Sequence, residues 1–269
     1  MRRPGLSGLL TKDRALLLAY DHGLEHGPED FEDKSVDPAY VISIAKEAGY
    51  NGIILQKGIA ERYYSDPHKG LPLVVKLNGK TNLFKGEPNS EQVCSVEEAA
   101  ELGASAVGYT VYIGSAFESE MFEEFGRIEE EAHDQGLPVI LWAYPRGKAV
   151  KKMTPKLVEY AARVGLELGA DFVKVKYTGS VGSFTRVVQA AGKCRVLCLG
   201  GSKLPDRRFL QLARDAMSAG ASGMAVGRNI WQHKEPLKIS EALKRVVFDG
   251  ISVEAAMEKL NTKNMGRGK

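Results

Sequence analysis

A pattern of helix, glycine and apolar strand occurs four times in the chain, and it restricts the fold more than any other feature. The four segments are EAGYNGIILQ (47–56), ELGASAVGYTVY (101–112), ELGADFVKVKY (167–177) and SAGASGMAVG (218–227). Each contains a glycine where a left-handed residue ends a helix, at positions 49, 103, 169 and 220. A helix that ends in glycine and leads into a strand is the second half of a βα unit.

Four further apolar runs bounded by Gly or Pro predict strands between these segments, over 15–21, 71–78, 138–145 and 194–200. Helical spacing predicts helices over 37–48, 95–102, 118–135, 155–168, 205–219 and 236–247, and a short one over 58–65. Eight apolar strands with helices after most of them predict a (β/α)8 TIM barrel of the α/β class. A doubly wound sheet is the alternative, but its glycine fingerprint is missing after the first strand, where the chain reads DHGLEHGP.

We expect one domain over residues 1–269, with a barrel core of about 15–248, an extra helix over 252–260 and a mobile tail over 262–269. The net charge of +3 is too small to favour a nucleic-acid partner. No run of eighteen apolar residues predicts a membrane span. Three cysteines without a pairing or metal-binding pattern favour the reducing cytoplasm.

The predicted strand at the end of segment 167–177, the sixth of the eight along the chain, carries the most informative polar residues of the predicted barrel. Alternation directs Phe172, Lys174 and Lys176 inward, and Val173 and Val175 outward. Burial and a second cation both lower the pKa of an amine, and a neutral amine can form a Schiff base. We expect Lys174, the deeper lysine, to be the nucleophile and Lys176 to supply the second charge. Two lysines in structural ion pairs are the other interpretation.

Polar side chains also lie at the ends of the predicted strands over 15–21 and 138–145. Asp21 shares a strand face with Ala19 and Leu17, and Tyr144 shares one with Trp142, where a tyrosine can act as a general acid or base. A helix cap and an aromatic packed at the rim are the structural alternatives.

The segment from His22 to His26 spells the zinc-binding pattern H-x-x-E-H. That pattern requires a helix. Gly23 within the segment and the Gly27-Pro28 pair after it predict no helix here, so we expect no metal.

Glycine-rich turns follow the last two predicted strands, the one over 194–200 and the one at the end of segment 218–227. The loops after these two strands commonly bind phosphate in barrels. They contain Gly200, Gly201, Ser202 and Lys203 in one loop and Gly227 and Arg228 in the other. The NIWQ segment after Arg228 predicts a short helix whose amides support an anion.

Five motifs in order between about residues 15 and 235 resemble those of the archaeal-type class I fructose-1,6-bisphosphate aldolases. They are AYDHGLEHGP, KLNGKT, WAYPRG, ELGADFVKVKYTG and AVGRNIWQ. The resemblance implies reversible cleavage of fructose 1,6-bisphosphate to dihydroxyacetone phosphate and glyceraldehyde 3-phosphate, in glycolysis and gluconeogenesis. It also implies a Schiff base without metal or other cofactor, and a large homo-oligomer such as a decamer.

The resemblance makes Lys174 the Schiff-base lysine, Tyr144 the proton donor and acceptor, and Asp21 an active-site carboxylate. The implied substrate contacts are His22, His26, Asp30, Trp142, Arg146 and Lys176, and the implied phosphate site is Gly200, Gly201, Ser202, Lys203, Gly227 and Arg228. The family usually has a small polar residue before Gly-Gly and a proline after it, where this chain has Leu199 and Ser202. We expect this departure to affect the geometry of the phosphate site more than the covalent chemistry at Lys174.

The division of proton transfers is also an expectation. We expect Tyr144, with its pKa lowered by Lys176 or Arg146, to take the proton of the C4 hydroxyl and then protonate the enamine. Asp21 is expected to move protons at the carbinolamine stage.

Two other functions stay open at this stage. A sister family shares the barrel but acts as a 2-amino-3,7-dideoxy-D-threo-hept-6-ulosonate synthase-type transaldolase, and it typically lacks the Glu25-His26 pair. A non-catalytic phosphosugar-binding protein is the second. Binding alone needs no buried amine, so an inward Lys174 favours an enzyme.

Overall fold

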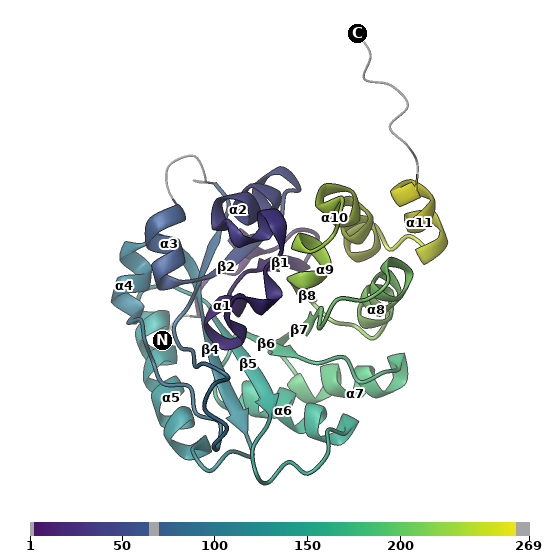
Figure 1. Cartoon of the computed structure of the whole chain (residues 1–269). Helices are drawn as coiled ribbons and strands as arrows, with labels where there is room; N and C mark the ends of the chain where they lie inside the picture. The colour runs from purple at the N-terminus through teal and green to yellow at the C-terminus, as the bar shows by residue number, and fades with distance from the viewer. Residues whose placement is uncertain (1–2, 65–69, 262–269) are drawn as a thin grey trace.

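Eight parallel strands form a closed barrel in the computed structural model, which describes residues 3–64 and 70–261. Each strand pairs with the next along the chain, and the last pairs with the first. The helices follow one another around the barrel in chain order, as Figure 1 shows. The predicted (β/α)8 barrel is confirmed.

The elements alternate as the repeated pattern predicts. The strands are β1 Ala15–Ala19, β2 Gly52–Gln56, β3 Leu73–Lys76, β4 Ala104–Ile113, β5 Val139–Pro145, β6 Phe172–Val175, β7 Arg195–Leu199 and β8 Gly223–Val226. The helices are α1 His22–His26, α2 Pro38–Glu47, α3 Lys57–Tyr63, α4 Val96–Glu101, α5 Glu118–Asp134, α6 Pro155–Glu167, α7 Val181–Ala191, α8 Asp206–Ser218, α9 Arg228–Trp231, α10 Pro236–Lys244 and α11 Val253–Asn261. Three 3-10 turns, Ser7–Leu9, Gly27–Asp30 and Asp33–Val36, and a π-helical turn, Arg245–Asp249, complete the order.

Local sequence signals account for most helix ends. The four repeat glycines, 49, 103, 169 and 220, have φ angles of 64°, 80°, 86° and 93°, the left-handed region that glycine adopts without steric cost. The extra C-terminal helix begins as expected, because the Ser252 hydroxyl accepts a hydrogen bond from the amide of Ala255 at 3.2 Å. The predicted tail over 262–269 lies outside the described residues.

Alternation along the strands divides the core into two layers. Side chains such as Leu17, Ile54 and Phe172 fill the barrel interior, whereas neighbours such as Leu18 and Val173 pack against the surrounding helices. This filled interior closes the floor of the barrel, so polar side chains are accommodated at the carboxyl ends of the strands. Among residues 3–64 and 70–261, no helix is both long and apolar enough to cross a membrane.

One local prediction is wrong. The segment His22–His26 forms the single-turn helix α1. Gly23 lies inside this turn and leaves room for the Phe31 ring, since a Cβ at that position would lie 3.1 Å from the ring. Gly27, at φ 70°, ends the turn. Figure 1 shows α1 in front of the strands, across the mouth of the barrel.

Candidate active site

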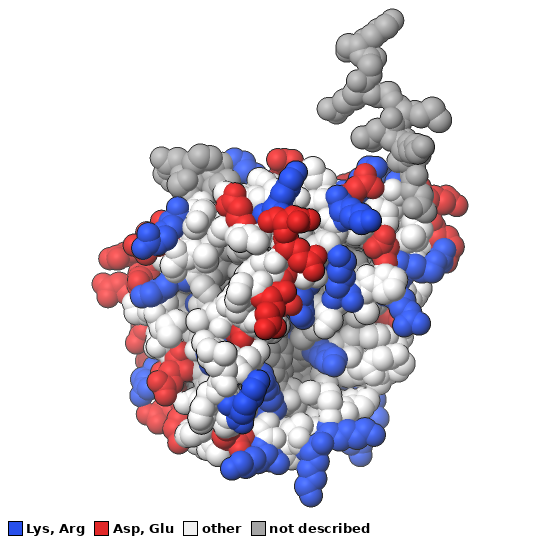
Figure 2. All heavy atoms as spheres, in the orientation of Figure 1, with Lys and Arg blue, Asp and Glu red and all other residues white. Residues whose placement is uncertain are grey.

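A pocket opens at the carboxyl ends of the strands, and most of the predicted site residues line it. They are Asp21, His22, His26, Trp142, Tyr144, Lys174, Gly200, Gly201, Gly227 and Arg228. The face of the molecule that carries this mouth is hollowed near its centre and bears side chains of both charges (Figure 2). The residues come from loops and strands far apart in the sequence, and closure of the barrel brings them together.

Lys174 lies inside the barrel at the end of β6, as alternation predicts. Its exposure is 5%, and its Nζ lies 4.6 Å from the centre of the Trp142 ring. Burial lowers the pKa of this amine, and the negative charges of Asp21 and Glu25 oppose that shift only in part. The lowered pKa increases the fraction of neutral amine, which is the nucleophilic form.

Asp21 faces the same amine from the end of β1. Burial alone raises the pKa of its carboxyl group, but the neighbouring Lys174, His22 and Lys76 side chains, together with a backbone hydrogen bond, outweigh burial and lower it. The carboxylate is therefore ionised at neutral pH. An ionised carboxylate beside Lys174 stabilises positive charge on the lysine nitrogen, including the charge of a protonated imine.

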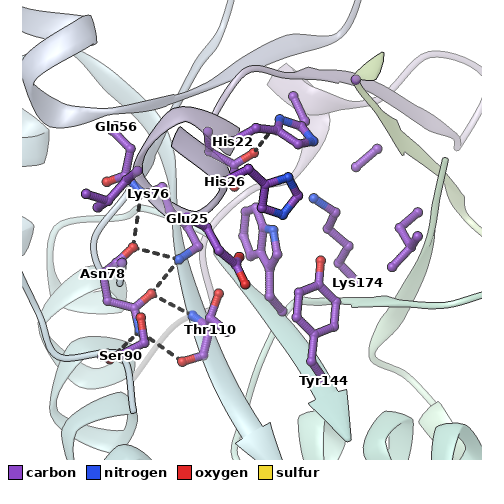
Figure 3. A pocket seen from close by; sticks show the side chains of 18 of the residues that line it. His22, Glu25, His26, Gln56, Lys76, Asn78, Ser90, Thr110, Tyr144 and Lys174 are labelled. Carbon is purple, nitrogen blue, oxygen red and sulfur yellow. Dashed lines mark hydrogen bonds and ion pairs between the residues drawn. The ribbon is translucent and has the colours of Figure 1, made fainter. Parts of the chain in front are cut away.

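Tyr144 points toward Lys174 in Figure 3. The expectation of a lowered tyrosine pKa is wrong. Burial and the negative charges of Asp21 and Glu25 raise the pKa of Tyr144 well above 10. Arg146 does not stabilise a phenolate, since it pairs with Glu25 instead. Tyr144 is a neutral phenol in the resting site, so it can begin a reaction only as a proton donor.

Lys76 is the second buried lysine of the site, and the expectation that Lys176 faces inward is wrong, whereas its contact with substrate stays a prediction. β6 ends at Val175, and Lys176 is exposed and outside the pocket lining. Lys76, at the end of β3, is 3% exposed and lines the pocket. Burial lowers its pKa to about 7. The same alternation argument identifies Lys76, because it follows the inward Val74 by two residues.

Asn78 holds Lys76 in place (Figure 3). The Lys76 ammonium nitrogen donates to the carbonyl oxygen of Asn78 at 2.8 Å and to its Oδ1 at 2.5 Å. The Asn78 amide is itself bound to β4, accepting from the backbone N–H of Thr110 at 2.8 Å and donating to its carbonyl at 2.9 Å. Sequence reasoning did not single out either residue.

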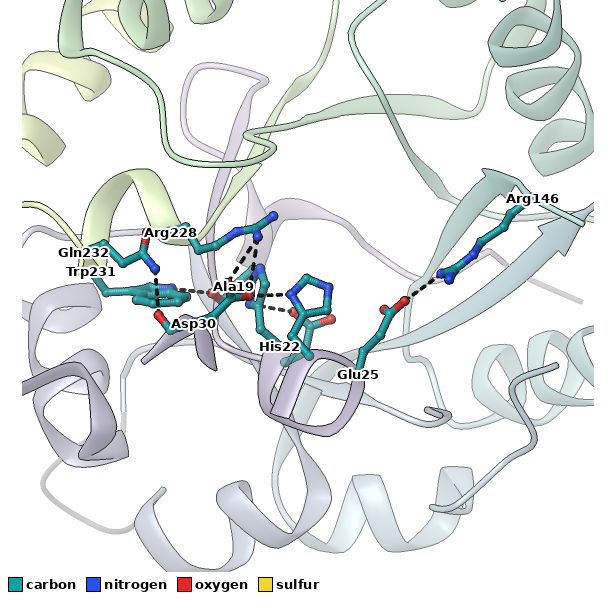
Figure 4. Close-up of polar contacts among 10 residues, drawn as sticks. Ala19, His22, Glu25, Asp30, Arg146, Arg228, Trp231 and Gln232 are labelled. Atoms are coloured by element: carbon teal, nitrogen blue, oxygen red, sulfur yellow. Dashed lines mark hydrogen bonds and ion pairs between the residues drawn. The ribbon is translucent and has the colours of Figure 1, made fainter. Parts of the chain in front are cut away.

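The predicted substrate contact Asp30 lies outside the pocket lining and bonds to two residues that line it. Its carboxylate bonds to the His26 ring and accepts from the guanidinium of Arg228 at 3.3 Å (Figure 4). Gln232 donates to the Asp30 carbonyl at 2.6 Å. Asp30 therefore orients two residues that do line the pocket.

Arg146 is also outside the lining, because its side chain turns to the rim. Its guanidinium pairs with Glu25 of α1 at 3.0 Å and lies 5.6 Å from the centre of the Tyr112 ring. The pair joins the end of β5 to α1 across the mouth, as Figure 4 shows. Glu25 and Tyr112 both line the pocket, and neither was identified from the sequence as a site residue.

The predicted phosphate loops are only partly confirmed as pocket lining. Gly200, Gly201, Gly227 and Arg228 line it, whereas Ser202 and Lys203 are exposed and outside it. The buried Asn229 explains the turn of the loop, since its side-chain amide donates to the carbonyls of Gly200 at 3.0 Å and Ser202 at 3.1 Å. Lys203 instead donates to the carbonyl of Gln232.

Two buried nitrogens at this end of the pocket have no hydrogen-bond partner within the described part of the chain. They are Nε of Arg228 and Nδ1 of His22. Burial lowers the pKa of His22 to about 4, so its ring is neutral at pH 7. Unpaired buried polar atoms are costly, and a ligand that bonds to them removes that cost. No group of three or more His, Cys, Asp or Glu side chains suited to a metal occurs among residues 3–64 and 70–261.

Comparisons with known proteins agree with this geometry. The model of the DeoC/LacD family aldolases matches residues 15–233. The class 1 fructose-bisphosphate aldolase of Thermoproteus tenax is 51% identical over 243 residues, covering 89% of this chain and 91% of that one. That of Halobacterium salinarum is 46% identical over 262 residues, covering 96% and 100%.

Solved structures agree as well. An archaeal fructose-1,6-bisphosphate aldolase with its catalytic lysine covalently bound to the carbinolamine intermediate of the substrate has a TM-score of 0.86. It is 49% identical, covering 90% of this chain and 97% of that one. The fructose-bisphosphate aldolase of Slackia heliotrinireducens has a TM-score of 0.90 at 32% identity, covering 98% and 91%. The chain belongs to the DeoC/LacD family of aldolases.

Proposed function

We propose that the protein is a class I fructose-1,6-bisphosphate aldolase that works through a Schiff base on Lys174. It cleaves fructose 1,6-bisphosphate to dihydroxyacetone phosphate and glyceraldehyde 3-phosphate, reversibly and without a metal. The observation that carries the proposal is a buried amine with a lowered pKa at the end of β6, beside an ionised Asp21. The curated relatives from Thermoproteus and Halobacterium support the substrate.

The neutral amine of Lys174 attacks the C2 ketone of the sugar and gives a carbinolamine. Tyr144 then donates its proton to the departing C2 hydroxyl, and water leaves as the protonated imine forms. The resulting phenolate lies beside a new positive charge, which stabilises it. The raised pKa of the free phenol therefore suits its first step.

The phenolate of Tyr144 and the protonated imine on Lys174 together bring about cleavage. The phenolate takes the proton of the C4 hydroxyl, the C3–C4 bond breaks, and its electron pair moves toward the imine to form an enamine. The aldehyde product leaves. Tyr144, again a phenol, protonates C3 of the enamine, and water then releases the second product from Lys174. Each proton that Tyr144 gives, it regains.

The loops after β7 and β8 are proposed to bind the C1 phosphate. Gly200, Gly201 and Gly227 line this end of the pocket, and the buried Nε of Arg228 is free to donate, whereas the Gly200 amide already donates to the carbonyl of Ala225 at 3.0 Å. Gly227 lets the His22 ring pack closely against the loop, because a Cβ at that position would lie 2.6 Å from the ring. Binding energy from a remote phosphate orients the reacting carbons.

We also propose that the enzyme is a cytoplasmic homo-oligomer. Three buried free cysteines suit a reducing compartment. Exposed apolar side chains such as Phe84 and Tyr160, at 76% and 61% exposure, are available for contacts between subunits. Light scattering after size-exclusion chromatography is expected to give a mass several times that of the 29.3 kDa chain. A monomer at all concentrations would contradict this.

A coupled assay for dihydroxyacetone phosphate release tests the function. Fructose 1,6-bisphosphate is expected to be cleaved, and prior treatment with EDTA is expected to leave the rate unchanged. Formation of an amino-heptulosonate product in place of cleavage would favour the transaldolase alternative. Zinc-dependent recovery of activity after EDTA would contradict the metal-free mechanism.

A further inference from the structure

A second buried amine, Lys76, lies in the pocket and has no role in the mechanism above. It ends β3, where its backbone pairs in register with Gly108 of β4. Its 3% exposure is as low as that of Lys174, and an amine buried this deeply is costly unless it is used or fully paired.

Both amines contact one side chain, the indole of Trp142. Trp142 pairs in register with Lys174 of β6, and the nitrogen of Lys174 lies 4.6 Å from the ring centre. The indole then extends over β4, where the missing Cβ of Gly108 would lie 2.3 Å from the ring. The nitrogen of Lys76 lies 5.4 Å from the same centre. Both amine nitrogens therefore lie close to one ring, which extends from β5 over β4.

The bonding of Lys76 leaves one direction free. Two of its three N–H groups are taken by the carbonyl and the side-chain oxygen of Asn78. The acceptors cannot move, because the Asn78 side chain is held by Thr110 and Ser90 and is fully buried. An ammonium group has one further donor, and Lys76 lines the pocket. One free N–H suits a single substrate oxygen and is a poor match for a phosphate group.

The direction of the sugar chain identifies that oxygen. If the C1 phosphate lies at the β7 and β8 loops, as proposed above, and C2 is bonded to Lys174 on β6, the remaining carbons would run over Trp142 toward β4 and β3. The C4 hydroxyl is two carbons beyond the imine carbon, on the side of Lys76. Its oxygen gains negative charge as the C3–C4 bond breaks.

We propose, on the basis of the function proposed above, that Lys76 is a second catalytic residue, which donates its free N–H to O4. In cleavage, the proton of O4 passes to Tyr144, the C3–C4 electron pair moves to the imine, and O4 becomes the aldehyde oxygen. Lys76 keeps its proton throughout. In the reverse reaction it polarises the aldehyde carbonyl. A fixed donor in a water-poor site stabilises such developing charge strongly. Asn78 is its positioning residue.

The two halves of the reaction separate this role from a structural one. Dihydroxyacetone phosphate has no O4, yet it forms the imine and enamine on Lys174 and exchanges a C3 proton with solvent. In Lys76→Met, exchange of deuterium into dihydroxyacetone phosphate, followed by NMR, is expected to stay within about threefold of the wild type. Cleavage of fructose 1,6-bisphosphate is expected to fall about 10²–10³-fold in kcat.

Lys148→Met is the matched control, because Lys148 is an exposed lysine after β5 and outside the pocket lining. It is expected to change neither assay. If Lys76→Met fails to fold, Lys76→Gln takes both assays in its place.

Normal cleavage by the Lys76 variant would overturn the proposal, and so would an equal loss of exchange and cleavage, which would place Lys76 in imine formation. A wild-type protein that neither exchanges nor cleaves would instead contradict the proposed function itself.

Discussion

Charges buried around one tryptophan determine what each residue of the site can do. Lys174 and Lys76 both have lowered pKa values because they are desolvated, and both are opposed by the same two carboxylates, Asp21 and Glu25. The carboxylates in turn raise the pKa of Tyr144. Burial therefore favours the neutral forms of the amines and of the phenol, while the neighbouring cations favour the ionised form of Asp21, and imine formation uses this combination.

Tyr144→Phe tests the assignment of the first proton. Without a donor for the departing C2 hydroxyl, we expect the carbinolamine to lose water slowly, so both borohydride trapping of the imine and cleavage fall, cleavage by about 10²–10⁴-fold. Stopped-flow and quenched trapping measure the two rates. Undiminished trapping together with lost cleavage would show that another group, such as Asp21, donates the first proton.

The pKa of Lys76 makes a prediction about stability. Its pKa is about 7 in the folded protein and 10.5 in a solvated chain. Between these two pH values the unfolded state binds more protons than the folded state. The unfolding free energy of the wild type therefore rises with pH, and Lys76 contributes at most about 1.4 kcal/mol per pH unit to that rise. Lys76→Met lacks this gain.

The stability advantage of Lys76→Met over the wild type is therefore expected to be largest at pH 7 and to shrink toward pH 10. Urea denaturation of both proteins at several pH values measures the difference, in which the other titrating groups largely cancel. A difference in unfolding free energy that is constant with pH would contradict the conclusion that burial lowers the pKa of Lys76.

Arg228→Met tests the phosphate end. Removing the guanidinium takes away a charged donor, and we expect kcat/KM for fructose 1,6-bisphosphate to fall at least tenfold, since hydrogen bonds to charged groups contribute about 1.5–3 kcal/mol. Turnover of a sugar without a C1 phosphate is expected to change little. Equal losses on both substrates would remove Arg228 from phosphate binding.

At the scale of elements, the strands were predictable from apolar alternation, but their ends were not. The error at Lys176 arose because alternation was carried one residue past Val175, where β6 ends. Helix α7 was not assigned from the sequence, because VGSFTRVVQAA contains glycine and several β-branched residues. It forms because Phe184 and Val187 are buried against the barrel. Tertiary packing supplies what local propensity lacks.

Gly108 on β4 is expected to control the floor of the site. A methyl group at this position would meet the Trp142 ring at 2.3 Å, and both lie in a closed interior. Gly108→Ala is therefore expected to displace the indole, change tryptophan fluorescence, lower activity at least tenfold and cost about 1–3 kcal/mol of stability. Gly126→Ala in α5, with no atom within 4 Å of the new methyl, is the control. Unchanged fluorescence and activity in Gly108→Ala would show that the site tolerates the new methyl group without displacement of the Trp142 ring.

At the scale of the whole molecule, the repeated βα pattern was sufficient to predict the closed barrel, and the rule that polar strand ends meet at one face placed Lys174, Tyr144 and Asp21 together. The protonation states were not predictable in the same way. The raised pKa of Tyr144 depends first on its burial, and then on the negative charges of Asp21 and of Glu25, which α1 carries over the mouth. Such contacts across the barrel exist only after closure.

Borohydride trapping tests the central claim, a Schiff base on Lys174, most directly. The protein is incubated with dihydroxyacetone phosphate or fructose 1,6-bisphosphate, reduced, digested and mapped by mass spectrometry. We predict one stable adduct, on the peptide and residue of Lys174, and none in Lys174→Met. An adduct on Lys76, or full cleavage activity without any adduct, would contradict the account.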